Sequence, residues 1–329
     1  MSPHHVHMSL TCTLSTTITR QSHLARVLAH VGLVLALFGC QSPADRSADE
    51  ATAPARQLVD LRSRILTYTA ELGRDDAYTP PDDTARERVA EAVGRLMDGE
   101  TAEAGRALTP LGLKVTRLTD TESGRRYDEI AAARPGRAEG WGRLYLTADS
   151  DVRWNVQVPH PVSDRDTEGL GVRLLEDNPG GSLVLAGAHR EAGRRDAADV
   201  AHREDSMFHA VVVALQKRNV PGVQLHGFAK ESHRPYEAVL STGAARRALT
   251  EAAALADGME ADGLRVCRGW SARCPLEGTR NVQGRVAERH HATFLHVELS
   301  PDARGDGTDA EAAATALSGL VTTWNSAGR

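Results

Sequence analysis

The pattern of apolar and polar positions divides the chain after its first fifty residues. Between residues 55 and 73, leucine and isoleucine recur every three to four positions, the spacing of one helix face, and Gly73 can end that helix. A second helical pattern runs from about Asp83 to Met97. An apolar segment at Leu113–Leu118 then turns through Glu-Ser-Gly and returns past Tyr127, which predicts a hairpin. Residues 57–139 are therefore expected to form a small helical and hairpin extension.

From residue 140 onward, short apolar strands alternate with helices. Strands are predicted at 143–147, 154–158, 183–188, 223–228, 238–241 and 293–299, and helices at 167–177, 198–218, 244–257 and 309–326. Alternation of this kind is typical of helices packed on both faces of a sheet. The sequence thus predicts an α/β fold, a three-layer sandwich with a mixed sheet, over residues 140–329.

The N-terminus has the pattern of an export signal. An apolar run from Val27 to Gly39 is shorter than the roughly 20 residues that a membrane-spanning helix needs, and it fits the core of a secretory signal. Leu37–Cys40 resembles the bacterial lipobox, whose cysteine becomes lipidated. We therefore expect a lipoprotein signal peptide at residues 1–39, with Met8 as an alternative start to Met1. Lipidation of Cys40 would anchor the exported protein to a bacterial membrane, with residues 40–56 as a polar tether.

Composition and charge limit the classes of molecule that the protein is expected to bind. Hydrophobic residues make up 41% of the 329, enough for a packed core, and a net charge of −5 offers no basic face for nucleic acid. Two cysteines remain beyond the lipobox, Cys267 and Cys274. Export would place them in an oxidising compartment, which favours a disulfide. A zinc-binding pair is the alternative, although six intervening residues are not a usual ligand spacing.

Histidine is concentrated in the second half of the chain. Of 14 histidines, five precede residue 40 and the other nine lie between residues 160 and 296. Three predicted strands end near a metal-ligand type of residue: His160 is followed by acidic residues, His226 ends a second strand, and Glu298 lies near the end of a third. Strand ends of an open α/β sheet converge on one ligand site. Two histidines and a carboxylate leave zinc one open position, and a further carboxylate can act as general base.

These motifs carry a resemblance to known enzymes. The order of His160, a nearby acid, His226 and the strand Phe294–Leu299 (FLHVEL) resembles the zinc-dependent N-acetylmuramoyl-L-alanine amidases. The loop that begins at His160 is also similar to that of poly-gamma-glutamate hydrolases. The resemblance implies a zinc exopeptidase-like sandwich and hydrolysis of an amide or peptide bond in an envelope-derived substrate. The implied zinc ligands are His160, His226 and an acid, and the implied general base is Glu298.

The sequence leaves the identity of the acidic ligand open. Prolines flank His160 where the amidases have a glycine-rich loop, and their glutamate ligand lies farther along the chain. Asp164 within the loop and Glu168 at a helix start are both candidates, and we prefer Asp164. As helix-capping residues, the same acids would have a purely structural role.

Other polar residues are weaker candidates. Arg190 could bind a substrate carboxylate through its planar guanidinium group, and Asn281 and Arg304 are further candidate substrate contacts. Asp199 and His202 could orient a metal ligand by hydrogen-bonding to it without contacting the metal themselves. A surface arginine or a half-buried helix face would explain the same pattern without function. Ser241 lacks the glycine that flanks the serine of a nucleophile elbow, which argues against a serine hydrolase. The main rival is a non-catalytic envelope lipoprotein that binds a ligand or a partner.

Overall fold

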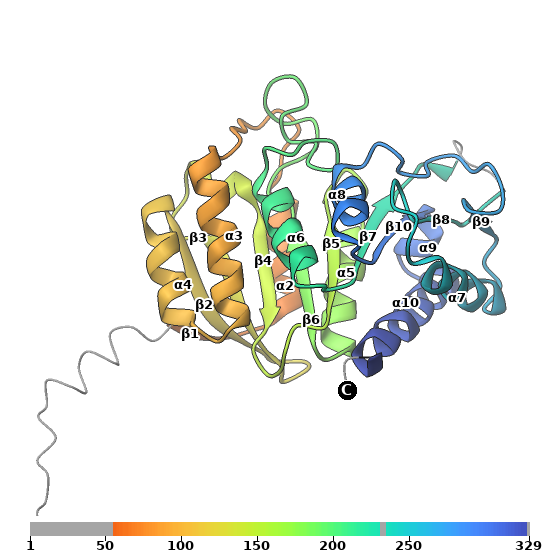
Figure 1. Ribbon diagram of the computed structural model, residues 1–329, viewed down its shortest axis with the longest axis horizontal. Coiled ribbons are helices and arrows are strands. Elements are labelled where there is room, and N and C mark those ends of the chain that lie inside the picture. Colours follow the sequence, from red (N-terminus) through yellow and green to blue (C-terminus); the bar gives the residue numbers. More distant parts are fainter. Residues whose placement is uncertain (1–54, 231–234, 328–329) are drawn as a thin grey trace, which may run out of the picture. The chain divides into compact units, whose positions relative to one another are not determined.

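The computed structural model describes residues 55–230 and 235–327, so the expected signal peptide, Cys40 and most of the tether lie outside the described residues. A ten-stranded mixed sheet runs through this part of the chain in the order β1-β2-β3-β4-β6-β5-β7-β10-β8-β9 (Figure 1). The strands are β1 (Ala55–Val59), β2 (Leu113–Asp120), β3 (Arg126–Ala132), β4 (Arg143–Thr147), β5 (Trp154–Val158), β6 (Gly181–Leu185), β7 (Gly222–Gly227), β8 (Ala238–Ser241), β9 (Val266–Arg268) and β10 (Phe294–Leu299).

Four parallel strands, β6, β5, β7 and β10, form the centre of the sheet. The predicted hairpin is present as the antiparallel pair β2 and β3, and β3 pairs in turn with β4. The sheet is thus continuous across residue 140, because three strands of the N-terminal extension join it.

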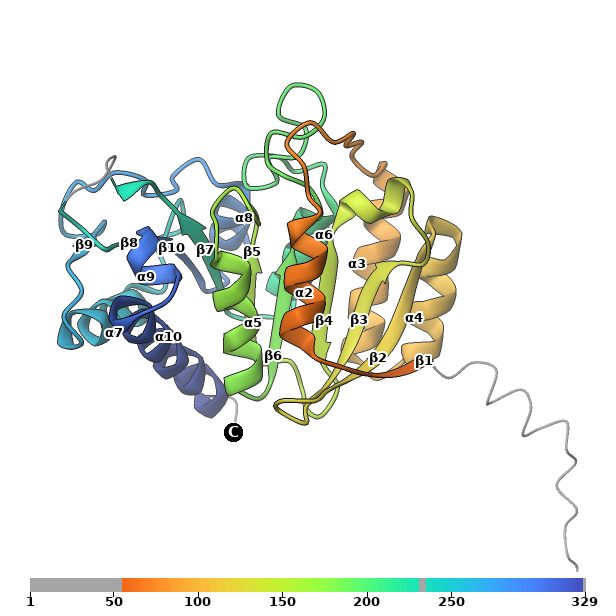
Figure 2. The same ribbon diagram turned by 180° about the vertical axis from the view of Figure 1, so that it is seen from behind.

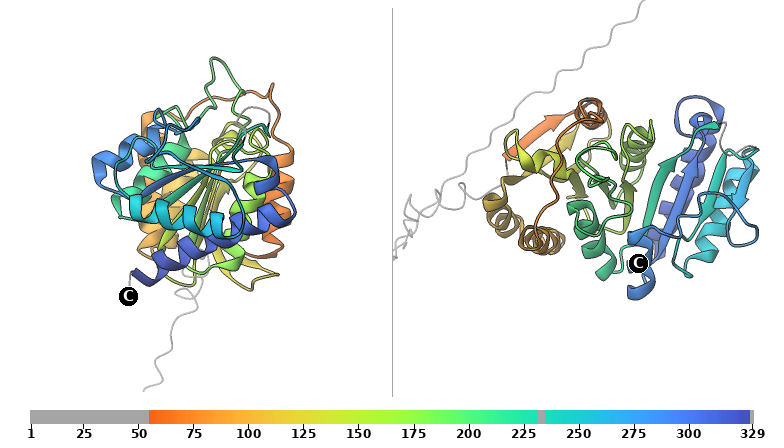
Figure 3. Two further views of the ribbon diagram at one scale, coloured as in Figure 1. Left: turned by 90° about the vertical axis from the view of Figure 1, so that its right-hand side faces the viewer. Right: turned by 90° about the horizontal axis from the view of Figure 1, so that it is seen from above.

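Helices cover both faces of the sheet and complete the predicted α/β three-layer sandwich (Figures 2 and 3). One layer contains α2, α5, α7 and α10, and the other contains α3, α4, α6 and α8. The helices are α2 (Leu61–Ala70), α3 (Asp83–Met97), α4 (Thr101–Leu108), α5 (Thr167–Asp177), α6 (Met207–Lys217), α7 (Leu249–Ala261), α8 (Val282–His290), α9 (Pro301–Arg304) and α10 (Thr308–Ala327). Two short 3-10 helices lie at Thr109–Leu111 and Arg137–Trp141.

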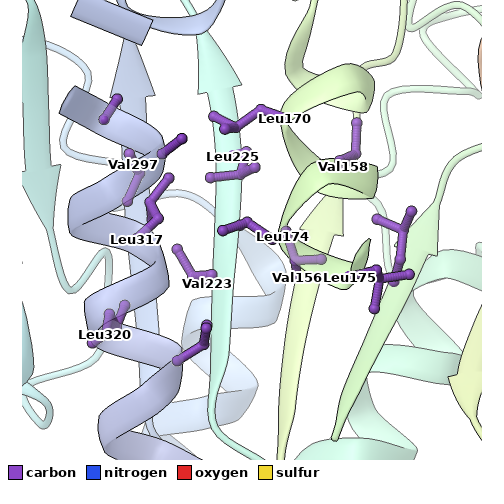
Figure 4. Close-up of a cluster of buried hydrophobic side chains, with 14 of the residues drawn as sticks. Val156, Val158, Leu170, Leu174, Leu175, Val223, Leu225, Val297, Leu317 and Leu320 are labelled. Atoms are coloured by element: carbon purple, nitrogen blue, oxygen red, sulfur yellow. The ribbon is translucent and has the colours of Figure 1, made fainter. Parts of the chain in front are cut away.

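The central strands have one apolar and one polar face, although both faces are buried. Val156, Leu225 and Val297 point toward α5 and α10, where they pack with Leu174 and Leu317 (Figure 4). Because side chains alternate along a strand, the intervening residues face α6 and α8. Those residues are polar and buried: Gln157, Gln224, His226, His296 and Glu298.

Two of the predicted helices were placed wrongly at their starts. The helix predicted at 198–218 begins only at Met207, where the side chain of Ser206 accepts a hydrogen bond from the His209 amide and caps it. Residues 198–206 form a loop instead. The helix predicted at 244–257 spans Leu249–Ala261. The helical pattern that starts at residue 55 was wrong over its first five residues, which form the strand β1 beside β2, and the short elements β9, α8 and α9 were not predicted.

Candidate metal centre and cleft

The polar cluster lies at the carboxyl ends of the parallel strands. His160 lies two residues after the end of β5, His226 lies in β7 and Glu298 lies in β10. The register of the parallel pair β7 and β10 places Glu298 beside His226 and His296 beside Gln224. Three segments far apart in sequence therefore meet at one sheet edge, as expected for a ligand site in an open α/β sheet.

Three potential ligand atoms converge at the centre of this cluster. The Oδ2 atom of Asp164 lies 3.2 Å from Nδ1 of His160 and 3.3 Å from Nδ1 of His226. The three residues are between 1% and 6% exposed. Zinc binds histidine at about 2.0–2.1 Å with tetrahedral angles, which separates neighbouring ligand atoms by about 3.3–3.4 Å. The observed spacing therefore suits a small divalent cation.

A tight turn places Asp164 beside His160. The Asp164 amide donates a hydrogen bond to the His160 carbonyl at 2.9 Å. Val162, between them, has a φ of 67°, which a β-branched residue rarely adopts. Backbone strain of this kind tends to accumulate at functional sites. The Val162 amide donates to the carboxylate of Glu168 at 3.4 Å. Glu168 thus supports the turn, whereas Asp164 contacts both histidines.

The protonation states of His226 and Asp164 favour a cation between them. Burial lowers the pKa of His226, so its ring is neutral near pH 7. Its Nε2 atom lies 2.8 Å from the Oε1 atom of Gln224, which only accepts hydrogen bonds, so Nε2 carries the proton. Burial opposes the ionisation of Asp164, but its hydrogen bond with His160 lowers its pKa. The Nδ1 lone pair of His226 therefore faces a carboxylate oxygen, a contact between two acceptors that a metal ion would satisfy.

A second carboxylate holds His160 from the other side. Asp199 lies 2.8 Å from Nε2 of His160, accepts a hydrogen bond from Arg190 at 2.9 Å, and lies 3.1 Å from Nδ1 of His202. Burial opposes ionisation of Asp199, yet its hydrogen bonds with His160 and His202 lower its pKa, so it remains charged. A carboxylate behind a histidine orients the ring and strengthens it as a metal ligand.

Glu298 is positioned differently from the two aspartates. Burial, with a contribution from the charge of Asp164, raises its pKa well above the usual value. One carboxylate oxygen lies 3.9 Å from Nε2 of His296. The pKa of His296 is lowered well below its usual value, by burial and by the neighbouring His226. Glu298 is therefore a buried carboxyl group of raised basicity beside the candidate metal ligands.

A cleft of about 550 Å³ opens onto these groups. It is lined by the buried residues His160, His226, His296 and Glu298, by Arg190 and His202, and by a wall made of residues 273–274 and 276–281. The predicted disulfide is present. The bond between Cys267 and Cys274 closes a short loop that precedes the cleft-lining residues 276–281. Gly278 lies so close to the His296 ring that a Cβ there would be 2.4 Å from it. A groove of about 770 Å³ between α3 and α6 contains none of the clustered groups.

The three residues predicted to contact substrate have different roles in the structure. Arg190 reaches the cleft and approaches Nδ1 of His160 to 3.5 Å. Asn281 lines the cleft but uses its side chain to cap α8 and to donate a hydrogen bond to Gln224. The Arg304 guanidinium donates to the carbonyls of Arg165, Phe228 and Leu299, so it ties three segments together.

No protein-family model and no curated protein sequence matches the chain. Among solved structures, it is similar to N-formylglutamate amidohydrolase from Ralstonia eutropha JMP134, at 15% identity and a TM-score of 0.36 over 54% of this chain and 94% of that one. A putative carboxypeptidase from Burkholderia mallei ATCC 23344 has 14% identity and a TM-score of 0.38, over 76% of this chain and 69% of that one.

A third similar structure is a succinylglutamatedesuccinylase/aspartoacylase from Rhodobacter sphaeroides, at 11% identity and a TM-score of 0.34 over 65% of this chain and 64% of that one. Similarities this distant carry no conclusion about function, which we infer from the side chains. Across residues 55–230 and 235–327, no helix combines the length and the apolar character needed to cross a membrane.

Gln157, Gln224 and Gln283 were not predicted from the sequence, although Gln224 contacts His226 and hydrogen-bonds to the other two. All three are at most 1% exposed. The sequence does contain a signal for Gln157 and Gln224, because each places a polar amide among the apolar residues of its strand, in the segments WNVQV and GVQLHG. A polar residue in a strand buried on both faces needs a hydrogen-bond partner, so these glutamines indicate a buried polar network.

Proposed function

We propose that this protein is a zinc-dependent hydrolase that cleaves an amide or peptide bond in an envelope-derived substrate. The observation that carries the proposal is the convergence of His160, Asp164 and His226 on one point, with Glu298 beside them. These three residues would hold the ion. When bound, zinc supplies Lewis-acid polarisation of the scissile carbonyl group. The resemblance of the sequence motifs to zinc amidases implies the same roles.

The side chains of the cleft account for the rest of the chemistry. Glu298, with its raised pKa, is suited to take a proton from the attacking water and to pass it to the leaving amine. Asp199 holds the ring of His160, and Arg190 is held by the same carboxylate. The Arg190 guanidinium can then stabilise negative charge that develops on the substrate beside His160.

Charge on the cleft wall supports an anionic substrate. Arg273 and Arg280 are exposed and line the cleft beside Arg190. Guanidinium groups bind carboxylates by paired hydrogen bonds. We therefore propose a peptide or amide that carries free carboxylates, such as a peptidoglycan stem peptide or a γ-glutamyl chain. Arg280→Glu should weaken cleavage of such substrates more than cleavage of their amidated forms. Arg285→Glu, at an exposed position on α8 that does not line the cleft, is the matched control.

Glu298→Gln tests the catalytic assignment. Glutamine keeps the size and the hydrogen bonding of glutamate but cannot accept a proton from water. The variant should retain zinc and lose turnover by about 10²–10⁴-fold, measured on peptidoglycan fragments and γ-glutamyl polymers. Glu237→Gln is the control, since Glu237 pairs with Arg265 away from the cleft. Undiminished turnover in Glu298→Gln would remove Glu298 from the mechanism.

The cellular location is also a proposal. We infer that the protein is exported and tethered to a bacterial membrane through lipid on Cys40, because residues 27–40 have the pattern of a lipoprotein signal. Cys40→Ser should abolish lipidation and leave an unprocessed precursor, as detected by membrane fractionation and mass spectrometry. Normal processing and unchanged membrane partition of this variant would contradict the anchor.

A further inference from the structure

A group of buried amide side chains adjoins His226 on the side away from Asp164. Gln157, Gln224, Asn281 and Gln283 are each at most 2% exposed. Burying an amide is costly unless its oxygen and its nitrogen both find partners. Gln224 lies at the centre of this group and hydrogen-bonds to each of the other three amides.

The two residues from α8 have orientations that are fixed by the backbone. The Gly284 amide donates to Oδ1 of Asn281 at 3.0 Å, so the NH₂ group of Asn281 must face Gln224. The NH₂ group of Gln283 donates to the Val200 carbonyl at 2.9 Å, so its oxygen faces Gln224. Neither side chain can turn over without losing its backbone partner.

These constraints leave Gln224 a single orientation. Its oxygen must face the NH₂ group of Asn281, and its own NH₂ group must face the oxygens of Gln157, at 3.0 Å, and Gln283, at 3.4 Å. The same Gln224 oxygen lies 2.8 Å from Nε2 of His226. An amide oxygen cannot donate, so this contact is a hydrogen bond only if Nε2 of His226 carries the proton.

We propose that Gln224 is a positioning residue that locks His226 in its Nε2-protonated form, so that the Nδ1 lone pair is already directed at the metal position before any ion binds. The lock is needed because a competing acceptor is present. Asp164 lies 3.3 Å from Nδ1 and would favour a proton there if Gln224 did not hold it on the opposite nitrogen. The tautomer is a property of the metal-free protein, and only its consequence for zinc affinity rests on the proposed function.

Gln224→Met tests the lock, because methionine has a similar size and no strong acceptor. We expect His226 to change to the Nδ1-protonated tautomer, which hydrogen-bonds to Asp164. Zinc affinity should fall by about 10–100-fold, the usual effect of losing a group that orients a metal-binding histidine. Gln224→Glu retains an oxygen toward His226 and should restore both the tautomer and most of the affinity.

The primary measurement is the two-bond ¹H–¹⁵N correlation spectrum of ¹⁵N-histidine-labelled protein after removal of metal with a chelator, which reports the protonated ring nitrogen. Zinc affinity follows from competition with a chromogenic chelator. Gln216→Met is the matched control. Gln216 is also a buried amide, and its side chain donates a hydrogen bond to the backbone carbonyl of Gln283, but it has no hydrogen bond with Gln224 or His226. It should leave the tautomer unchanged.

Either of two results would overturn the proposal. One is an Nδ1-protonated His226 in the unaltered metal-free protein. The other is a Gln224→Met protein that keeps both the Nε2 proton and its zinc affinity, which would make Gln224 a packing residue only. A locked tautomer in a protein that hydrolyses no amide would leave this inference standing and refute the proposed hydrolase function instead.

Discussion

Protonation of His209 should make the protein markedly less stable in mild acid. His209 lies at the start of α6, is 8% exposed, and faces the NH₂ group of Gln283 at 3.3 Å. Burial lowers its pKa from 6.5 to about 4. In the unfolded chain, His209 therefore binds a proton below about pH 6.5, whereas in the folded protein it binds one only below about pH 4. Stability consequently falls as the pH falls through this window.

The size of the effect follows from the two pKa values. A difference of one pKa unit corresponds to about 1.4 kcal/mol, so the linkage predicts a loss of about 2 kcal/mol at pH 5 and about 3 kcal/mol at pH 4, relative to pH 7. Other groups titrate in the same range, so the loss must be isolated by difference. His209→Gln keeps an acceptor for Gln283 and does not titrate.

The assay is urea unfolding of both proteins at pH 4, 5, 6 and 7, with a chelator present so that metal binding does not contribute. The free energy of unfolding of the unaltered protein should fall more steeply than that of His209→Gln by the amounts given above. Parallel pH profiles for the two proteins would refute the inference that His209 is held neutral by burial.

Two further predictions concern stability. Replacing Cys267 and Cys274 by alanine should lower the free energy of unfolding by about 2 kcal/mol, because the disulfide closes a short loop, and the unaltered protein should show neither thiol in denaturant without reductant. Gly142→Ala should destabilise by at least about 1 kcal/mol, since φ is 101° and a Cβ would lie 2.2 Å from the Leu185 carbonyl oxygen. Gly105→Ala, in open space on α4, should instead stabilise by about 0.5–1 kcal/mol, and equal effects of the two substitutions would show that the backbone at Gly142 does not require glycine.

The sequence carried strong signals for the centre of the fold. Residues 154–158 and the segment around His226 alternate apolar and polar side chains, and this period-two pattern survives because one face meets α5 and α10 while the other meets the polar network. The helix predicted at 167–177 matches α5, and the hairpin formed by β2 and β3 is confirmed. In each case, local pattern and tertiary environment favour the same structure.

The parts that could not be predicted depend on distant contacts. Residues 198–206 look helical in isolation but form a loop, and the Val200 carbonyl there accepts a hydrogen bond from Gln283, more than eighty residues later. The orientation of Gln224 likewise depends on residues that cap α8. Such hydrogen bonds leave no periodic trace in the sequence, because each partner is a single polar residue in an unrelated segment.

The metal content of the purified protein tests the central claim most directly. After dialysis against zinc and removal of loosely bound ions, elemental analysis should find one equivalent per chain. His226→Gln and Asp164→Asn each remove one of the three converging groups and should lose that equivalent, whereas Glu298→Gln should keep it. An unaltered protein without stoichiometric zinc, or an Asp164→Asn variant with a full equivalent, would contradict the proposed metal centre.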